Sequence, residues 1–170
     1  MKIKNYDEID VPNNSLVILD LDETIIHFPY ITGNWWENTK NAYKLINEKT
    51  ADSRAYADWL YIITTYSPNV LDEYTFNNLL KRIKETNSSF IIVTARNIQL
   101  KEITQKHLKS CGINCDVYYS LDKGIMINAI KKNYIYNHIL FVDDNPKYIK
   151  QVEELNPEIH TYFIKHENLI

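Results

Sequence analysis

Short apolar segments bounded by turn residues recur along the chain, and they predict β-strands. Four segments show this pattern best, at residues 16–19, 90–93, 117–119 and 139–142. Each is apolar enough to be buried on both faces, as the strands of a parallel sheet are. The segments therefore predict a buried parallel sheet.

Stretches with helical character lie between these strands. Residues 72–86 start with acidic residues and end with basic ones, and residues 97–110 run from a potential asparagine N-cap to just before a glycine. Residues 123–132 and 146–155 give two more helices. Because strands alternate with helices, the sequence predicts an α/β fold, a three-layer α/β/α sandwich with a central parallel sheet of the Rossmann type.

One interval is too long for this alternation. A unit of strand, helix and strand takes roughly 30 residues, whereas 64 residues lie between Thr24 and Ser89. About half of this interval must therefore be an insertion. We expect a core domain formed by residues 1–29 and 69–170, with a small helical cap inserted at residues 30–68.

The expected cap is rich in aromatic residues. It contains two helix-like stretches, at residues 36–49 and 52–66. The simplest interpretation of the aromatic residues is that they form the core of the insertion and its contact with the sheet. They are Trp35, Trp36, Tyr43, Tyr56, Trp59, Tyr61 and Tyr66.

The composition limits the classes of partner. The chain has 170 residues, of which 45% are hydrophobic, so one compact domain with a real core is expected. The formal net charge is −3, and the 19 basic and 22 acidic residues are interspersed along the chain. No basic footprint for nucleic acid is present.

The sequence also indicates a cellular compartment. The first residues lack the apolar region of a signal peptide, and no segment approaches the ~18 apolar residues that a membrane span requires. We therefore expect a soluble, cytoplasmic protein with no membrane partner. In that compartment Cys111 and Cys115 are expected to be free thiols, and their surroundings in the sequence do not suggest a zinc site.

Two acidic pairs follow predicted strands. Asp20 and Asp22 come directly after the first strand, and Asp143 and Asp144 come after the last. Ligands bind at the carboxyl ends of strands in open α/β sheets, so both pairs would meet at one edge. Each like-charge contact at ~4 Å costs about 4 kcal/mol at an effective dielectric near 20. Such a cluster requires a cation, and ligands that are all oxygen favour Mg²⁺.

Groups that could hold a phosphate occur at the same edge. Thr94 ends a predicted strand, and its hydroxyl together with backbone N–H groups such as that of Ala95 could bind phosphate at a helix start. Lys123 opens a helix after a short loop and would bring positive charge. Each of these residues alone is weak evidence, whereas the ordered set is strong.

The ordered set resembles the four motifs of the haloacid dehalogenase superfamily, over about residues 15–155. The motifs are DLDET at 20–24, VTAR at 93–96, Lys123-Gly124 and VDDN at 142–145. The resemblance implies a Mg²⁺-dependent phosphoric monoester hydrolase that acts through an aspartyl phosphate. It makes Asp20 the nucleophile and Asp22 the general acid and base, with the backbone carbonyl of Asp22 on the metal.

The resemblance also implies the remaining roles. Thr94 and Lys123 would contact the transferring phosphoryl group, and the metal ligands would be Asp20, Asp22, Asp143 and Asp144. Asp144 is the better candidate for direct metal contact, while Asp143 binds either directly or through water. An acid at position 22 favours phosphoryl transfer over dehalogenation. The order of the motifs argues against a receiver domain, in which the acidic pair comes first.

Three interpretations of the function follow from these motifs. The expected cap favours a small phosphoester as substrate, because a cap excludes protein substrates. The first motif also resembles phosphatases that act on the C-terminal domain of RNA polymerase II, which makes a protein phosphatase the second interpretation. A non-catalytic binding protein on the same fold is the third. Arg96 either contacts substrate or lies on the surface at a helix start, and the five histidines show no ligand spacing.

Overall fold

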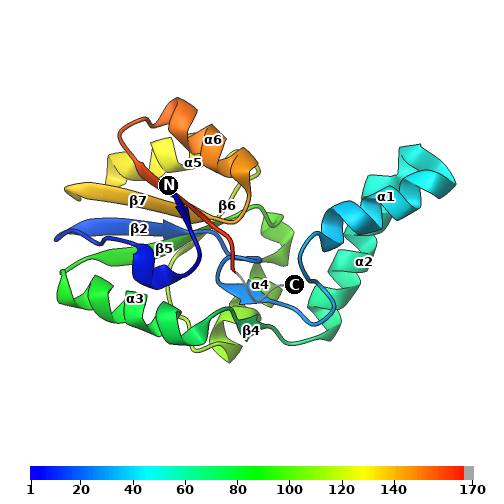
Figure 1. Ribbon diagram of the computed structural model, residues 1–170, viewed down its shortest axis with the longest axis horizontal. Helices are drawn as coiled ribbons and strands as arrows, with labels where there is room; N and C mark the ends of the chain where they lie inside the picture. The colour runs from blue at the N-terminus through cyan, green and yellow to red at the C-terminus, as the bar shows by residue number, and fades with distance from the viewer. Residues whose placement is uncertain (167–170) are drawn as a thin grey trace.

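The computed structural model describes residues 1–166 and contains a six-stranded parallel sheet (Figure 1). Its strands are β1 (Lys2–Ile3), β2 (Ser15–Leu19), β5 (Ser89–Thr94), β6 (Val117–Tyr119), β7 (His138–Asp143) and β8 (His160–Ile164). They lie in the order β1-β8-β7-β2-β5-β6, and every neighbouring pair is parallel. Because β2 lies between β7 and β5, residues that follow these three strands meet at one edge of the sheet.

Helices cover both faces of this sheet. They are α3 (Glu73–Glu85), α4 (Lys101–Ser110), α5 (Lys123–Ile130) and α6 (Pro146–Leu155). Apolar residues of α3 and α4 pack on the face that contains Val17 and Leu19, and those of α5 and α6 pack on the face of Leu16 and Ile18 (Figure 1). Since successive side chains of a strand point to opposite faces, β2 is apolar on both. The predicted three-layer α/β/α sandwich is confirmed.

The element bounds differ from the predicted ones in detail. The predicted helix at 97–110 begins as a 3₁₀ helix, η3 (Ile98–Leu100), before α4 starts, and the predicted helix at 123–132 ends at Ile130 in a second 3₁₀ turn, η4 (Lys131–Asn133). The bounds of the helix at 146–155 agree with the prediction at both ends. Its start is well defined because Asn145 caps it and Pro146 occupies its first turn. The strands β1 and β8 were not predicted; β1 is an edge strand of only two residues, and β8 is its neighbour.

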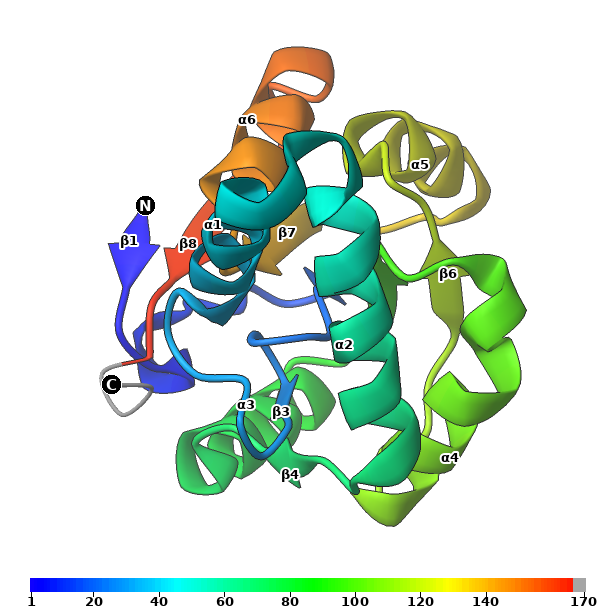
Figure 2. The same cartoon turned by 90° about the vertical axis from the view of Figure 1, so that its right-hand side faces the viewer.

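The long interval forms a pair of helices. They are α1 (Trp35–Asn47) and α2 (Ala51–Thr65), separated by the 3₁₀ turn η2 (Glu48–Thr50). At their base, β3 (Ile26–His27) pairs antiparallel with β4 (Asn69–Val70). Both helices lie beyond the end of the sheet at which its strands terminate (Figures 1 and 2).

Contacts hold the two helices together. The hydroxyl of Tyr43 in α1 donates to Asp58 in α2 at 2.7 Å, and Lys40 pairs with Asp52 at 2.6 Å. No residue of α1 is fully buried, but Trp35 at its start is partly buried against the main core. Several residues of α2 also pack against this core. The aromatic residues of the insertion therefore serve partly as its contact with the sheet.

Two further features of the described chain were predicted. Cys111 and Cys115 are both free thiols. Within residues 1–166, no helix combines the length and the apolar character that a membrane span requires.

Candidate active site

Asp20 lies at the carboxyl end of the central strand β2 and is 5% exposed. Its two oxygens have different partners. The ammonium of Lys123 donates to Oδ1, and the hydroxyl of Thr24 donates to Oδ2 at 3.1 Å. Lys123 also donates to Asp143 at 2.7 Å, so one buried ammonium joins the ends of β2 and β7. These contacts fix the orientation of the Asp20 carboxylate.

Three carboxylates form a compact acidic cluster at this edge. One oxygen each from Asp20, Asp143 and Asp144 lies within 4.8 Å of the other two, and within residues 1–166 no other group of acidic, histidine and cysteine side chains meets this standard. The sequence placed all three in the metal site. For Asp22 the resemblance implied only that its backbone carbonyl binds the metal, and the carboxylate of Asp22 is not part of the cluster.

The cluster carries more negative charge than the protein balances. When all three carboxylates are ionised, the ammonium of Lys123 leaves a net charge of −2. Burial raises the pKa of each carboxyl group, and repulsion by the neighbouring carboxylates adds to the rise at Asp143 and Asp144. Burial alone would lower the pKa of Lys123, but Asp20 and Asp143 outweigh this effect and raise it. An oxygen-only cluster with an excess of two charges fits a divalent cation such as Mg²⁺.

Lys123 reaches the cluster because α5 packs very closely on α6. It is the first residue of α5, whose N-cap Asp122 accepts a hydrogen bond from the backbone of Ile125. At the next position, a Cβ on Gly124 would lie 2.4 Å from the backbone oxygen of Gln151 in α6. Only glycine permits this approach without a shift of backbone. The Lys-Gly pair therefore combines the charged group with the helix contact that buries it.

Thr94 and Ala95 lie at the end of β5, next to β2. Thr94 is buried and its hydroxyl oxygen accepts a hydrogen bond from the backbone N–H of Arg96 at 3.2 Å. Ala95 is half-buried and leads into the turn before η3. The helix that was predicted to start here begins several residues later, so the backbone N–H groups near Thr94 belong to a loop.

Asp22 is turned away from the cluster and binds Arg96. The guanidinium donates from Nε at 2.8 Å and from Nη2 at 2.7 Å, one bond to each carboxylate oxygen. The side chain of Asp22 is 26% exposed, while that of Arg96 is 1% exposed. The interpretation of Arg96 as a surface residue at a helix start is therefore wrong. The alternative, contact with substrate, stays a prediction.

Arg96 has partners that the sequence did not reveal. Its Nη1 group lies 3.0 Å from the hydroxyl of Thr104 and 3.0 Å from Nδ1 of His107, both in α4. The rings of Phe28 and Trp59 lie within 6 Å of the guanidinium carbon. The one available signal was the spacing of Thr104 and His107, which puts both on one face of a helix.

Thr24 and Glu23 complete the loop after β2. Besides holding Asp20, the Thr24 hydroxyl accepts the backbone N–H of Asp144 at 3.1 Å, and the Thr24 carbonyl accepts from the hydroxyl of Tyr6. Glu23 has a left-handed backbone with φ of 58°. Its Oε2 atom is buried and has no hydrogen-bond partner within residues 1–166. Burial and the charges of Asp22 and Asp20 raise the pKa of Glu23 to about 8.

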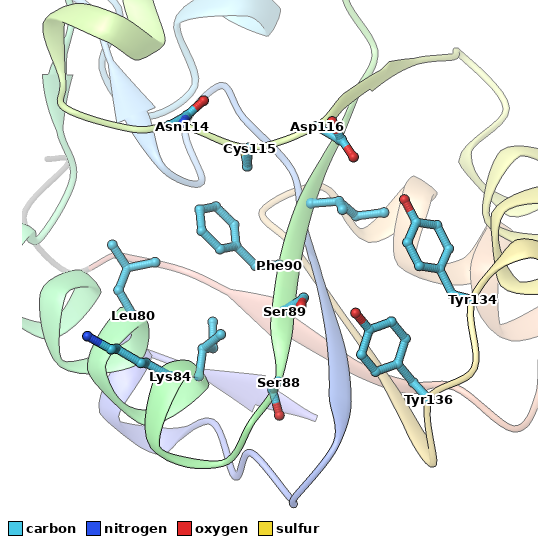
Figure 3. Close-up of a pocket in the computed structure, with 12 residues that line it drawn as sticks. Leu80, Lys84, Ser88, Ser89, Phe90, Asn114, Cys115, Asp116, Tyr134 and Tyr136 are labelled. Atoms are coloured by element: carbon cyan, nitrogen blue, oxygen red, sulfur yellow. The ribbon is translucent and has the colours of Figure 1, made fainter.

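A separate groove in the surface lies away from the acidic cluster. It is an open groove of about 690 Å³ at the start of β5, lined by Phe90, Cys115 and the stacked rings of Tyr134 and Tyr136 (Figure 3). These residues belong to the amino ends of the strands, at the opposite edge of the sheet from Asp20. The groove therefore does not contribute to the acidic cluster.

Comparison with solved structures supports the fold that the motifs implied. The class C acid phosphatase from Bacillus anthracis is similar to this chain, with a TM-score of 0.53 and 14% sequence identity. The similarity covers 94% of this chain and 69% of that protein. At this identity the likeness concerns the fold alone, which is an α/β sandwich.

Comparison of sequences identifies a family. No curated protein matches the chain significantly. Residues 2–120 match the family DUF2608, which is described as "Protein of unknown function". This segment contains Asp20, Asp22, Thr94 and Arg96 and makes up well over half of the sequence, so the chain belongs to the DUF2608 family.

Proposed function

We propose that the protein is a Mg²⁺-dependent phosphatase that hydrolyses a small phosphoester through an aspartyl phosphate on Asp20. The observation that carries this proposal is the arrangement of Asp20, Asp143 and Asp144 around Lys123 at the carboxyl edge of the sheet. Its excess of two negative charges suits a divalent cation, and a cation together with a lysine suits a phosphoryl group.

Asp20 acts as the nucleophile. Its carboxylate attacks phosphorus, the bond from phosphorus to the leaving oxygen breaks, and an acyl phosphate forms. The hydrogen bonds from Lys123 and Thr24 aim the carboxylate before the substrate arrives. Lys123, the hydroxyl of Thr94 and the backbone N–H of Ala95 stabilise the negative charge on the phosphoryl oxygens.

Four residues would hold the metal ion. The side chains of Asp20 and Asp144 and the backbone carbonyl of Asp22 would bind it directly, with Asp143 binding directly or through water. Mg²⁺ in this position would neutralise the phosphoryl oxygens and hold the phosphate in line with Asp20.

Asp22 transfers the protons. It donates one to the departing alkoxide in the first step and accepts one from the water that attacks the acyl phosphate in the second. In the structure both of its oxygens accept hydrogen bonds from Arg96, and these bonds hold the Asp22 carboxylate in place. Arg96 therefore controls the position of the group that completes each step.

The helices α1 and α2 support a small substrate. They form the cap that we assign to residues 30–68, and they lie over the edge of the sheet that holds Asp20 (Figure 2). Trp59 of α2 lies 5.8 Å from the guanidinium of Arg96, so a leaving group at Asp22 departs next to the cap. Such an enclosure favours a small molecule over a protein segment.

Hydrolysis of p-nitrophenyl phosphate tests the proposal. We expect turnover with Mg²⁺, loss of turnover with a chelator, and loss of at least about 10³-fold in kcat for Asp20→Asn, since the step depends on this nucleophile. Asp116→Asn, an exposed aspartate at the opposite edge of the sheet, is the matched control and should keep full activity. A phosphoryl group found on Asp20 by mass spectrometry after acid quench would identify the intermediate. Turnover that persists in Asp20→Asn, or no turnover on any of a broad set of phosphomonoesters, would refute the proposal.

A further inference from the structure

Arg96 is held far more firmly than an ion pair with Asp22 alone requires. Four of the five N–H donors of its guanidinium are used: two on Asp22, one on Thr104 and one on His107. The rings of Phe28 and Trp59 lie at 5.7 and 5.8 Å from its central carbon. A planar group with this many fixed partners has little freedom to turn.

His107 contacts both Arg96 and helix α2. Because a guanidinium has no acceptor, Nδ1 of His107 must accept the hydrogen bond from Arg96, so the ring proton sits on Nε2. The ring of His107 also lies beside the backbone of Ile63 in α2. The imidazole thus connects the helical pair to the guanidinium.

The surroundings of His107 keep its imidazole neutral. The residue is 5% exposed, and the ring of Phe28 meets it edge-on at 5.0 Å. Burial and the positive charge of Arg96 lower the pKa of His107 to about 4, although the backbone of Ile63 and the charge of Asp22 act in the opposite direction. At neutral pH the ring can therefore act as an acceptor for Arg96 at all times.

We infer that His107 is a positioning residue for the phosphatase reaction: its neutral imidazole, held between helix α2 and Arg96, keeps the guanidinium on Asp22 and so fixes the place of the proton-transferring carboxylate. This inference rests on the proposed function. Since α2 belongs to the helical pair over the site, the position of that pair is transmitted to Asp22 through one side chain. Helices α1 and α2 would then both enclose the substrate and align the carboxyl group of Asp22.

Variants of His107 separate positioning from mere stability. His107→Phe keeps a ring against Phe28 but removes the acceptor for Arg96, whereas His107→Asn can place an oxygen where Nδ1 lies. His107→Phe should lower kcat/KM about tenfold or more on an alkyl phosphate, whose leaving group needs a proton, and less than about threefold on p-nitrophenyl phosphate. His107→Asn should recover most of the alkyl phosphate activity. His138→Phe, at an exposed histidine at the start of β7, is the matched control and should show no such difference.

Nuclear magnetic resonance tests the hydrogen bond between Arg96 and His107 without any need for turnover. Nitrogen-15 spectra should show His107 protonated on Nε2 and unprotonated on Nδ1. They should also show slowly exchanging Nη resonances of Arg96, which are assigned by their loss in Arg96→Lys. The Nη resonances should average in His107→Phe and stay separate in His138→Phe. If the wild-type protein hydrolyses no substrate, the proposed function fails, whereas the spectra still test whether His107 holds Arg96 in place. Equal losses on both substrates in folded His107→Phe, a proton on Nδ1, or unchanged Arg96 resonances in that variant would each overturn the inference.

Discussion

Adding Mg²⁺ should stabilise the folded protein, and the stabilisation should grow as the pH rises. Burial and mutual repulsion raise the pKa values of Asp20, Asp143 and Asp144 in the metal-free protein. A carboxyl group whose pKa is raised by folding contributes stability at low pH and loses it as the pH rises through the raised value. The metal-free protein should therefore become less stable as the pH rises from about 4 through about 7, the raised pKa of Asp143, because the cluster acquires uncompensated charge over this range.

The size of the effect follows from binding linkage. A ligand at a hundred times its Kd, bound only by the folded state, adds about 2.7 kcal/mol. For a domain of this length each kcal/mol corresponds to about 2–4 °C in Tm, so Mg²⁺ should raise Tm by roughly 5–10 °C at pH 8. At pH 5 protons compete for the same oxygens, and the rise should shrink to about 2 °C or less.

Thermal unfolding followed by circular dichroism, with Mg²⁺ or with a chelator at a series of pH values, measures both quantities. Asp144→Asn removes one repelled carboxylate, so it should raise the metal-free Tm at pH 8 and abolish most of the rise caused by Mg²⁺. Asp116→Asn is the matched control and should behave as the wild type. The reasoning fails if the Mg²⁺ effect is equal at pH 5 and pH 8, or if Asp144→Asn retains it in full.

Three further predictions concern neighbouring features. Glu23→Gln should stabilise the metal-free protein by up to about 4 kcal/mol at pH 8 and by little at pH 4, because the pKa of Glu23 is raised to about 8 and folding disfavours its ionised form. Urea denaturation at both pH values measures the difference in unfolding free energy. Equal effects at the two pH values would contradict this prediction. Gly124→Ala should cost about 1–3 kcal/mol of folding free energy through its collision with Gln151, whereas Ile125→Ala on the exposed side of α5 should cost much less. Trp36→Ala, at an exposed residue of α1, should change relative rates over a panel of phosphoesters while the folding free energy stays within about 0.5 kcal/mol, and unchanged relative rates would count against the cap.

The layers of the fold could be predicted because burial on both sides leaves a strong trace in the sequence. The four strands that carry the core are short runs of apolar residues, and α6 is marked by Asn145 and Pro146 at its start. Strands β1 and β8 left a weaker trace. β1 has two residues, and β8 contains His160 and Thr161, so neither stands out as an apolar run.

The acidic cluster could be anticipated for a related reason. Asp20 follows β2, Asp143 is the last residue of β7, and Asp144 follows it; β2 and β7 lie side by side, and a parallel sheet brings such strand ends together. The partners of Arg96 could not be anticipated in this way. His107 and Trp59 come from two helices, and their meeting depends on how α2 and α4 sit over the edge of the sheet, which periodicity alone does not specify.

The different environments of Asp20 and Asp22 follow from where the chain leaves the sheet. In a continuing strand, residues two apart point to the same side, so both carboxylates would approach Lys123. Strand β2 ends at Leu19, and the left-handed backbone at Glu23 turns the chain back, with the N–H of Glu23 bonded to the carbonyl of Ile26. Asp20 therefore stays in the buried cluster with Lys123, while Asp22 faces Arg96. This separation gives two carboxylates in one short motif different charge partners, Lys123 for Asp20 and Arg96 for Asp22.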